Sequence, residues 1–302
     1  MPAILADLVI ALLLNSSPRG GRRAALAYLL NPVTFLLSVY HGQLHTAATA
    51  GAVLALWAAD RGQGGLSGVA LGAAVSIRHH FGLLIAPLLL RFQAHRCAIA
   101  LAFGLIVVLA NAPLLGSYRS GRLAAPIWVY GAWGYTMLLQ QGPRVLELIG
   151  LRGASSMVAG VNTLMRAAGP AVYWAWAAVF AAWTWRRARQ GTLTDAWRAA
   201  LFFLVGQYAI SPGFGVQWLI WALPFWLIVD AAGAVRYSVL AGVFLAGSYW
   251  QASLNAKYAL GSITAHLPLL SPVDLAGVLL VGIAGLLTWG YCVRAAWRLA
   301  WT

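Results

Sequence analysis

Long apolar runs recur along the whole chain and are separated only by short polar gaps. Hydrophobic residues make up 62% of the 302 residues, and charged residues only 9%. Ordinary soluble domains carry about 25% charged residues, so too few charges remain here to cover a surface that faces water. If lipid is the solvent, the backbone polar groups must be satisfied internally, by helices or by a closed barrel. The runs are continuous and do not alternate with polar residues, which excludes the barrel.

These runs predict an all-α, polytopic helical integral membrane protein that forms a single domain, residues 1–302, with about nine to eleven membrane segments. Several runs are shorter than the roughly 20 residues that span a bilayer, and we expect those to be tilted, broken or re-entrant. The long interval at about 117–166 is predicted to form an outer-face loop with an interfacial helix. The apolar segments fall at about 2–14, 24–40, 46–59, 64–77, 80–90, 96–116, 167–185, 199–211, 214–229, 237–252 and 272–293.

The basic residues predict the orientation of these segments. A net charge of +14 would suggest nucleic acid in a soluble protein, but here the arginines lie in the gaps between apolar runs. With the first gap placed in the cytoplasm, 13 of the 20 basic residues fall inside and 7 outside, as the positive-inside rule requires. Composition rich in Ala, Gly and Arg favours a bacterium. We therefore predict a multi-pass protein of the bacterial plasma membrane with membrane lipid, not nucleic acid, around it and its functional face outside the cytoplasm.

Polar residues gather where the run 24–40 reaches the predicted outer face. His41, Gly42 and Gln43 follow that run directly, and His45 directly precedes the next one. Histidine and glutamine offer donors and acceptors that suit a hydroxyl-rich substrate. The alternative is an interfacial loop with ordinary polar residues. Because polar residues in membrane segments usually mark function, the pattern favours a substrate site.

Arg78, His79 and His80 interrupt a long apolar stretch on the same predicted face. An arginine there is costly unless it reaches the interface or meets an anion, and a guanidinium suits a phosphate through bidentate hydrogen bonds. The alternative is that Arg78 extends to the membrane surface. His41, His45, His79 and His80 share one face, so a divalent metal site is a further alternative, but their spacing matches no recognised zinc pattern.

A third polar motif runs from Ser211 to Gln217 and separates two apolar segments. Its Pro and Gly residues predict a tight turn, which by itself requires only a helical hairpin. Gln217 and Trp218 would then face the same cavity as the histidines. Lys257, the only lysine, also falls on the predicted outer face.

Taken together, the motifs resemble the GT-C superfamily of membrane glycosyltransferases, and most closely the bacterial mannosyltransferases that use polyprenyl-phosphate mannose and the related glucosyltransferases. The likeness covers most of the chain. Asn31-Pro32, whose proline is expected to kink its helix, precedes a His-Gly-Gln pattern similar to the family's His-Gly-Gln-Phe-Asp. The motifs that carry the likeness are Asn31-Pro32, His41-Gly42-Gln43, Ser76-Ile-Arg78 with Pro87, Ser211 to Trp221, and Pro2 to Asp7.

The resemblance implies transfer of a hexose, with mannose as the first expectation, from a polyprenyl-phosphate donor to a lipid-linked or envelope glycan acceptor, and it implies no certain cofactor. His45 stands where the family's pattern has Asp, and the resemblance implies that the family's catalytic aspartate, in a first outer loop, would precede Met1. We therefore expect activity only if such an N-terminal part is supplied, with His45 or His41 as a replacement base, because imidazole titrates near neutrality. The expected substrate-binding residues are Gln43, Arg78, His79, His80, Ser211, Gln217 and Lys257.

Two other classes of protein fit part of the pattern. A transporter or flippase of a polyprenyl-linked or anionic substrate would also combine broken helices with a buried arginine, but it predicts an inverted repeat, and none is evident. A non-catalytic membrane subunit of a glycosyltransferase complex would account for the missing acidic loop.

Overall fold

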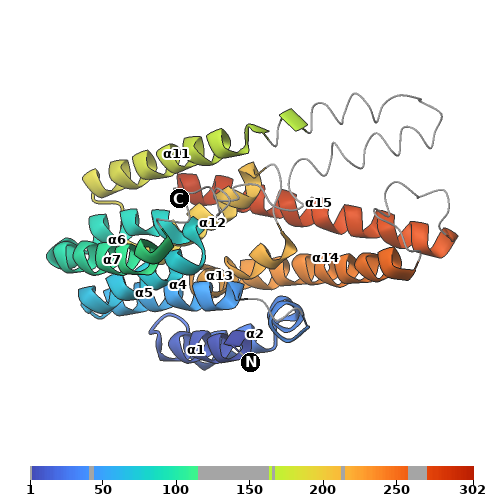
Figure 1. The fold of residues 1–302 in the computed structure, drawn as a ribbon, viewed down its shortest axis with the longest axis horizontal. Helices are drawn as coiled ribbons and strands as arrows, with labels where there is room; N and C mark the ends of the chain where they lie inside the picture. The colour runs from blue at the N-terminus through green and yellow to red at the C-terminus, as the bar shows by residue number, and fades with distance from the viewer. Residues whose placement is uncertain (1, 41–43, 115–162, 165–166, 212–214, 258–270) are drawn as a thin grey trace.

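The structure, a computed structural model, describes residues 2–40, 44–114, 163–164, 167–211, 215–257 and 271–302. Within them the secondary structure is helical, without strands, which confirms the predicted all-α class. Most helices lie side by side along the long axis of Figure 1. They are α1 Pro2–Ser16, α2 Gly21–Leu29, α3 Pro32–Thr34, the π-helix η1 Phe35–Tyr40, α4 His45–Asp60, α5 Gly64–Ile77, η2 His79–Leu84, α6 Ile85–Arg91, η3 Gln93–His95, α7 Arg96–Asn111, η4 Ala112–Leu114, α11 Gly169–Arg189, α12 Ala196–Ile210, η5 Val216–Ile220, α13 Leu223–Val229, α14 Ala231–Lys257 and α15 Pro272–Trp301.

Three described helical stretches are long and apolar enough to cross a membrane: Gln93–Asn111, Ala231–Ser253 and Pro272–Trp301. The number becomes four if the bent pair formed by Gly21–Leu29 and Pro32–Tyr40 is one span. The predicted nine to eleven segments are therefore wrong for the part of the chain that is described. The physical reason is length, because a helix of about 15 residues covers only ~22 Å of a hydrocarbon core ~30 Å thick. The interval 117–166 lies almost entirely outside the described residues.

The predicted kink at Asn31-Pro32 is confirmed. The helices before and after it meet at 43°. Asn31 is the N-cap of α3, where its side-chain oxygen accepts a hydrogen bond from the backbone N–H of Val33 at 3.0 Å. Its amide nitrogen donates to the hydroxyl of Ser238 on α14 at 2.7 Å. Asn31 therefore stabilises a break in the helix and attaches that break to a neighbouring span.

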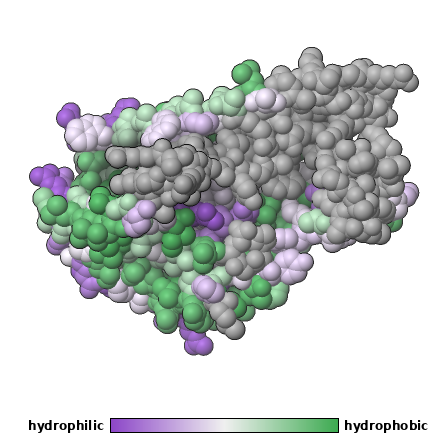
Figure 2. Space-filling view, viewed as in Figure 1, coloured by the Kyte–Doolittle hydropathy of each residue, from purple (hydrophilic) through white to green (hydrophobic). Residues whose placement is uncertain are grey.

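Apolar side chains cover much of the described surface (Figure 2). On α7, Leu101 is 74% exposed and Val108 63% exposed. On α15, Leu280 is 65% exposed. Large apolar surfaces of this kind mark contact with a membrane or a partner, and their position on two of the candidate spans agrees with a lipid environment.

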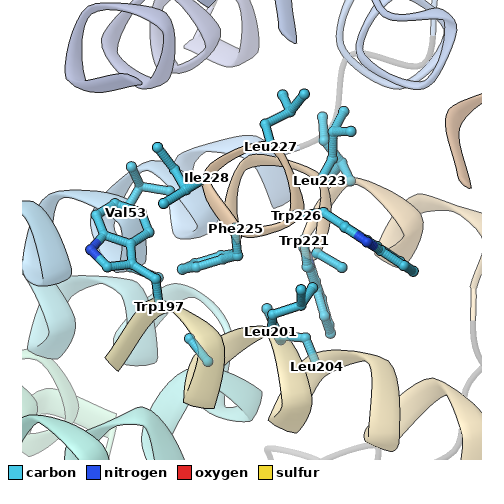
Figure 3. Packing of buried hydrophobic residues seen from close by; sticks show 14 of the residues in the cluster. Val53, Trp197, Leu201, Leu204, Trp221, Leu223, Phe225, Trp226, Leu227 and Ile228 are labelled. Carbon is cyan, nitrogen blue, oxygen red and sulfur yellow. The ribbon is translucent and has the colours of Figure 1, made fainter. Parts of the chain in front are cut away.

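The core is centred on α12 and α13, where nearly every side chain is buried. Trp197 and Trp221 are both at most 1% exposed, and Phe225 points toward Trp197 at a ring-centroid distance of 5.9 Å (Figure 3). Leu201 and Leu204 of α12 lie beneath α13 in the same view. The short α13, Leu223–Val229, is thus a buried core helix and not a membrane span, as its length requires.

Small residues allow α4, α5 and α7 to pack closely. A Cβ atom added at Gly51 of α4 would lie 2.9 Å from the carbonyl oxygen of Ala70 on α5. On the other face of α5, a Cβ atom at Gly68 would lie 2.8 Å from the Cβ of Ala102 on α7 and would also collide with the carbonyl of Ile99. Close backbone approach at small residues is a common way to pack helices in membranes.

We expect Gly68→Ala to destabilise the protein, because the added methyl group meets backbone atoms that can move only with α7. Overpacking of this kind typically costs about 1–3 kcal/mol. Gly65→Ala on the same helix is the matched control, since a Cβ atom there has nothing within 4 Å and alanine is the better helix former. Unfolding in detergent micelles measures both variants, and equal stability would contradict the packing argument.

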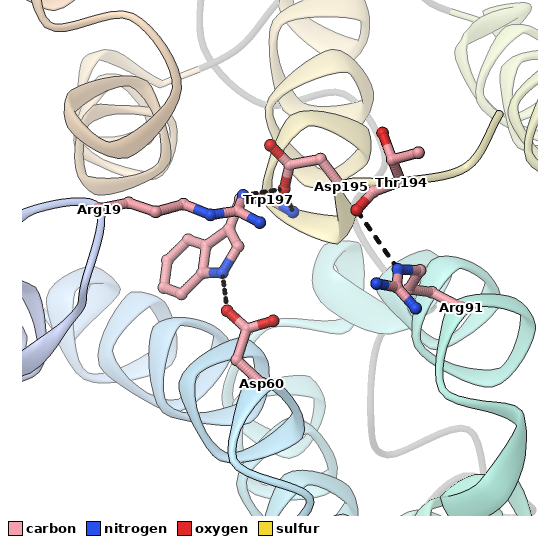
Figure 4. A network of polar contacts seen from close by, with 6 residues as sticks. All are labelled: Arg19, Asp60, Arg91, Thr194, Asp195 and Trp197. Atoms are coloured by element: carbon pink, nitrogen blue, oxygen red, sulfur yellow. Dashed lines mark hydrogen bonds and ion pairs between the residues drawn. The ribbon is translucent and has the colours of Figure 1, made fainter.

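A polar network fastens one end of the bundle (Figure 4). Trp197 at the start of α12 donates its indole N–H to Asp60 at the end of α4, at 2.7 Å. Asp195 forms an ion pair with Arg19 at 2.6 Å, and Arg91 donates to the carbonyl of Thr194 at 3.3 Å. The opposite end of α4 is His45, about 22 Å away for a helix of this length. The bundle therefore has an arginine-rich end near Asp60 and a histidine end near His45.

Candidate functional site

His45 and Arg78 meet at the histidine end of the bundle. His45 is the first residue of α4, and Arg78 is the C-cap of α5. Because these two helices form an antiparallel hairpin, the beginning of one lies beside the end of the other. A guanidinium nitrogen of Arg78 lies 3.0 Å from Nε2 of His45. His45 is only 4% exposed, so this contact is largely screened from solvent.

The contact determines the protonation state of His45. A guanidinium has only N–H donors, so the imidazole nitrogen that faces it must accept. Nε2 of His45 is therefore unprotonated, and the neutral ring carries its proton on Nδ1. In this arrangement the Nε2 lone pair is taken by Arg78, which favours a role for His45 in holding the guanidinium.

His79 and His80 extend this group into the 3-10 helix η2, which lies outside the candidate membrane spans. Their rings stack at a centroid distance of 4.0 Å. Burial, and then the neighbouring Arg78, lower the pKa of His79 to about 4. Burial also holds the pKa of His80 well below its ordinary value, with further contributions from His79, Arg78 and His45. The histidine–arginine cluster, His45, Arg78, His79 and His80, is therefore neutral at its imidazoles near pH 7 and positive only at Arg78.

This depressed pKa predicts that acid weakens the fold. The unfolded chain takes up a proton on His79 near pH 6.5, whereas the folded chain does so only near 4. Stability is therefore full above pH 6.5 and falls as the pH drops from 6.5 toward 4. We expect His79→Gln to flatten the decline of the melting temperature across this interval. Trp218→Phe is the control, because it alters the packing against His80 and removes no titrating group. An unchanged pH profile in His79→Gln would contradict the prediction.

Two tryptophans form a wall beside the cluster. The rings of Trp218 and Trp221 stack at 4.7 Å, His80 lies 4.6 Å from Trp218, and His45 stacks on Trp221 at 5.5 Å. The indole N–H of Trp221 is buried without a hydrogen-bond partner among the described residues. The wall thus combines aromatic faces with a buried donor next to the only charged group of the cluster.

Tyrosines from two helices hold this wall in position. Trp218 lies in the 3-10 helix η5, whose carbonyls are not all used within the helix. Tyr208 of α12 donates its hydroxyl to the carbonyl of Trp218. Tyr237 of α14 donates to the carbonyl of Leu219 at 2.6 Å. The short helix is therefore anchored from both sides, and the tryptophan rings project from a fixed backbone.

A buried carboxylate is connected to the start of α4 by hydroxyl groups. Asp7 of α1 is 4% exposed and accepts a hydrogen bond from the hydroxyl of Tyr28 at 2.8 Å. The hydroxyl of Ser38 lies near this carboxylate and 2.9 Å from that of Thr46, the residue after His45. An ionised carboxylate only accepts, so Tyr28 is the donor to Asp7, whereas either hydroxyl of the Ser38–Thr46 pair can donate to the other.

No family model, curated protein or solved structure matches this chain. The structure brings together His45, Arg78, His79 and His80 from the predicted site, as well as Trp218. Among the described residues no group of three His, Cys, Asp or Glu side chains is placed to hold a metal ion.

The other predicted site residues are placed less closely or are not described. Gln217 is buried, but its amide lies against Gly215, where a Cβ atom would be 2.5 Å from the side-chain nitrogen. Ser211 is buried where α12 ends. Lys257 ends α14 and only its backbone is described. His41 and Gln43 lie outside the described residues.

Sequence reasoning missed two parts of this site. Trp221 closes the motif Ser211 to Trp221, but only its stacking on His45 shows that it belongs with the histidines. Asp7 lies far from them in the sequence, and its connection depends on hydroxyls of η1 and α4. The sequence feature that could have identified Asp7 is the small number of acidic residues. The chain has only six, and acidic side chains are rarely fully buried unless they are paired.

Proposed function

We propose that this chain is the core of a membrane glycosyltransferase that transfers a hexose, mannose first among the candidates, from a polyprenyl-phosphate carrier to a lipid-linked or envelope glycan acceptor. The proposal places it in a bacterial plasma membrane with the histidine end of the bundle outside the cytoplasm. The observation that carries the proposal is the Arg78 guanidinium, held against neutral His45 beside the tryptophan wall.

Arg78 suits the phosphate of the carrier. It is the only charged member of the cluster, and the three imidazoles around it add no competing positive charge near pH 7. In a site of low polarity a guanidinium binds a phosphate more strongly than it would in water. A leaving phosphate gains negative charge as the sugar departs, so a fixed cation there stabilises the transition state more than the ground state.

Trp218 and Trp221 suit the sugar and the exclusion of water. Aromatic faces present broad apolar surfaces, and the indole N–H of Trp221 offers a buried donor to a hydroxyl group. Their anchoring by Tyr208 and Tyr237 provides the rigid support that a substrate-orienting surface requires.

In the proposed reaction, an acceptor hydroxyl attacks the anomeric carbon while the bond from that carbon to the phosphate oxygen breaks. The new glycosidic bond takes the acceptor oxygen, polyprenyl phosphate leaves with the bonding electron pair, and the hydroxyl proton passes to a base. We assign that proton to the Asp7 carboxylate, reached through Ser38 and Thr46. His45 then acts as a positioning residue for Arg78 and not as the base first expected from its sequence position.

The proposal is tested with the purified full chain in liposomes, supplied with polyprenyl-phosphate mannose or polyprenyl-phosphate glucose and an envelope-lipid extract as acceptor. Sugar transferred to the extract and binding of the donor are measured separately. Transfer from one of the two donors supports the proposal. Saturable donor binding without transfer would overturn the proposal in favour of a transporter or a non-catalytic subunit. If neither donor binding nor transfer were observed, the polyprenyl-phosphate sugar would be the wrong substrate.

A further inference from the structure

Four arginines line one cavity at the arginine-rich end of the bundle, away from the histidine–arginine cluster. The cavity has a volume of about 290 Å³ and lies where α12 and α14 begin and α15 ends. Arg294 and Arg298 are one helical turn apart on α15 and so project from the same face. The arginines of this cavity, called here the arginine cavity, are Arg198, Arg236, Arg294 and Arg298.

The arginine cavity has more positive charge than the protein itself offsets. Asp230 is the one acidic side chain in its lining, so the four arginine side chains carry a formal excess of three positive charges over it. Asp230 also caps α14 by accepting the backbone N–H of Gly233 at 2.9 Å. The one ion pair formed among the described residues joins Arg19 and Asp195 instead. Arg236, Arg294 and Arg298 are exposed, but like charges gathered around one cavity still repel one another, so an external anion would stabilise this arrangement.

One guanidinium already has a buried donor without a partner. Arg198 is half-buried, and its Nε is shielded from solvent with no hydrogen-bond partner in the part of the chain that is described. A buried N–H of this kind costs free energy until an acceptor reaches it. The cavity therefore offers an anion both excess charge and a hydrogen-bond donor that is not yet satisfied.

The cavity lies at the ends of two candidate membrane spans. It is formed at the ends of α14 and α15, both of which contain candidate membrane spans. Trp297 and Trp301 flank its arginines on α15 and are 67% and 71% exposed. Exposed tryptophans at the end of a span are typical of the interface between hydrocarbon and headgroups, and basic pockets between spans at that level recognise anionic headgroups.

We propose that the arginine cavity binds the phosphate of an anionic phospholipid headgroup. Arginine pairs with phosphate through two parallel hydrogen bonds. Four guanidinium groups around one cavity offer more such donors than one phosphate can accept. Binding should therefore tolerate the loss of one arginine better than the loss of two. This site is independent of the glycosyl transfer proposed above, because it lies at the other end of the bundle.

The test uses the full chain, freed of lipid in a neutral detergent and offered phosphatidylglycerol, phosphatidylcholine or inorganic phosphate. Native mass spectrometry counts the lipids retained, and the melting temperature reports binding of each probe. We compare the wild type with Arg236→Gln/Arg294→Gln and with Arg22→Gln/Arg23→Gln. The second pair lies on the exposed face of α2, outside the cavity lining, and changes the net charge equally.

We expect the wild type to retain phosphatidylglycerol over phosphatidylcholine. The cavity pair, which removes two guanidinium groups at once, should weaken that retention by roughly tenfold to a hundredfold, whereas the α2 pair should leave it unchanged. Arg236→Lys/Arg294→Lys, which keeps the charge but loses the bidentate geometry, should fall between them and guards against a folding defect. Equal retention of the two lipids, or equal loss in both glutamine pairs, would overturn the proposal. Stabilisation by inorganic phosphate as strong as that by phosphatidylglycerol would overturn the lipid assignment.

Discussion

Arg78→Ala is expected to weaken binding of a polyprenyl-phosphate sugar by roughly 30-fold to several thousand-fold. Truncating one partner of a buried, hydrogen-bonded charge pair typically costs about 2–5 kcal/mol, and each 1.4 kcal/mol is tenfold in affinity. Here the lost partner is the only charged group of the histidine–arginine cluster. Binding is measured by equilibrium titration of the purified full chain with polyprenyl-phosphate mannose.

Two further variants separate a phosphate contact from general damage. Arg78→Lys keeps the charge but not the bidentate geometry, so its affinity should lie between those of the wild type and Arg78→Ala. Arg61→Ala removes an arginine at the other end of α4, where the guanidinium donates to the carbonyl of Ser16 at 2.7 Å, and should leave the affinity for the carrier intact. Normal carrier binding by a folded Arg78→Ala protein would remove the assignment of Arg78 to the phosphate.

Asp7→Asn is expected to abolish most of the proposed transfer while the donor still binds. General-base catalysis contributes about 10²–10⁴-fold, and an asparagine can keep the hydrogen bond from Tyr28 but cannot take up a proton. The expected result is therefore a loss of turnover by about that factor, with donor affinity close to that of the wild type. Single-turnover transfer from a bound polyprenyl-phosphate sugar measures the chemical step apart from binding.

Asp60→Asn is the matched control for this prediction. Asp60 also accepts a hydrogen bond from an aromatic side chain, Trp197, at 2.7 Å, but it lies at the arginine-rich end of α4. Its substitution should affect stability alone. If both aspartate variants lost turnover equally, the role of Asp7 would be structural. If transfer survived in Asp7→Asn and was lost in His45→Ala, the histidine would be the base after all.

The two sets of variants test different links of the proposal. Arg78 concerns the affinity for the carrier, and Asp7 concerns the step in which bonds change. If Arg78→Ala loses affinity for the carrier, but the wild type itself transfers no sugar, the protein would be a carrier-binding protein and not an enzyme. The arginine cavity would be unaffected by either outcome, since neither Arg78 nor Asp7 lines it.

Some features followed from local sequence alone. The all-α class follows from continuous apolar runs in a chain with 9% charged residues, because a chain in lipid must satisfy its backbone internally. The bend at Asn31-Pro32 follows from the missing N–H of proline. Arg78, His79 and His80 were recognisable as a group because charged and polar residues in an apolar run are costly.

Other features depend on packing and could not be read from the chain. Apolar runs do not distinguish a span from a short core helix, so Leu223–Val229 looked like part of a membrane segment until its burial inside the bundle was known. The proximity of Asp7 on α1 to Ser38 on η1, and of Ser38 to Thr46 on α4, arises only when these helices pack together. The pairing of Arg78 with His45 requires α4 and α5 to be antiparallel.

What the sequence by itself determined is thus the class of structure and the residues that are costly to bury, because both depend on the chemistry of each residue in an apolar solvent. What only the tertiary structure decided is which of these residues meet. In the sequence, four arginines from α12, α14 and α15 indicated only the orientation of the membrane segments. In the structure, the same four arginines line one cavity. Contacts between residues far apart in the chain arise because packing brings helix ends together, and local sequence patterns do not predict which ends will be in contact.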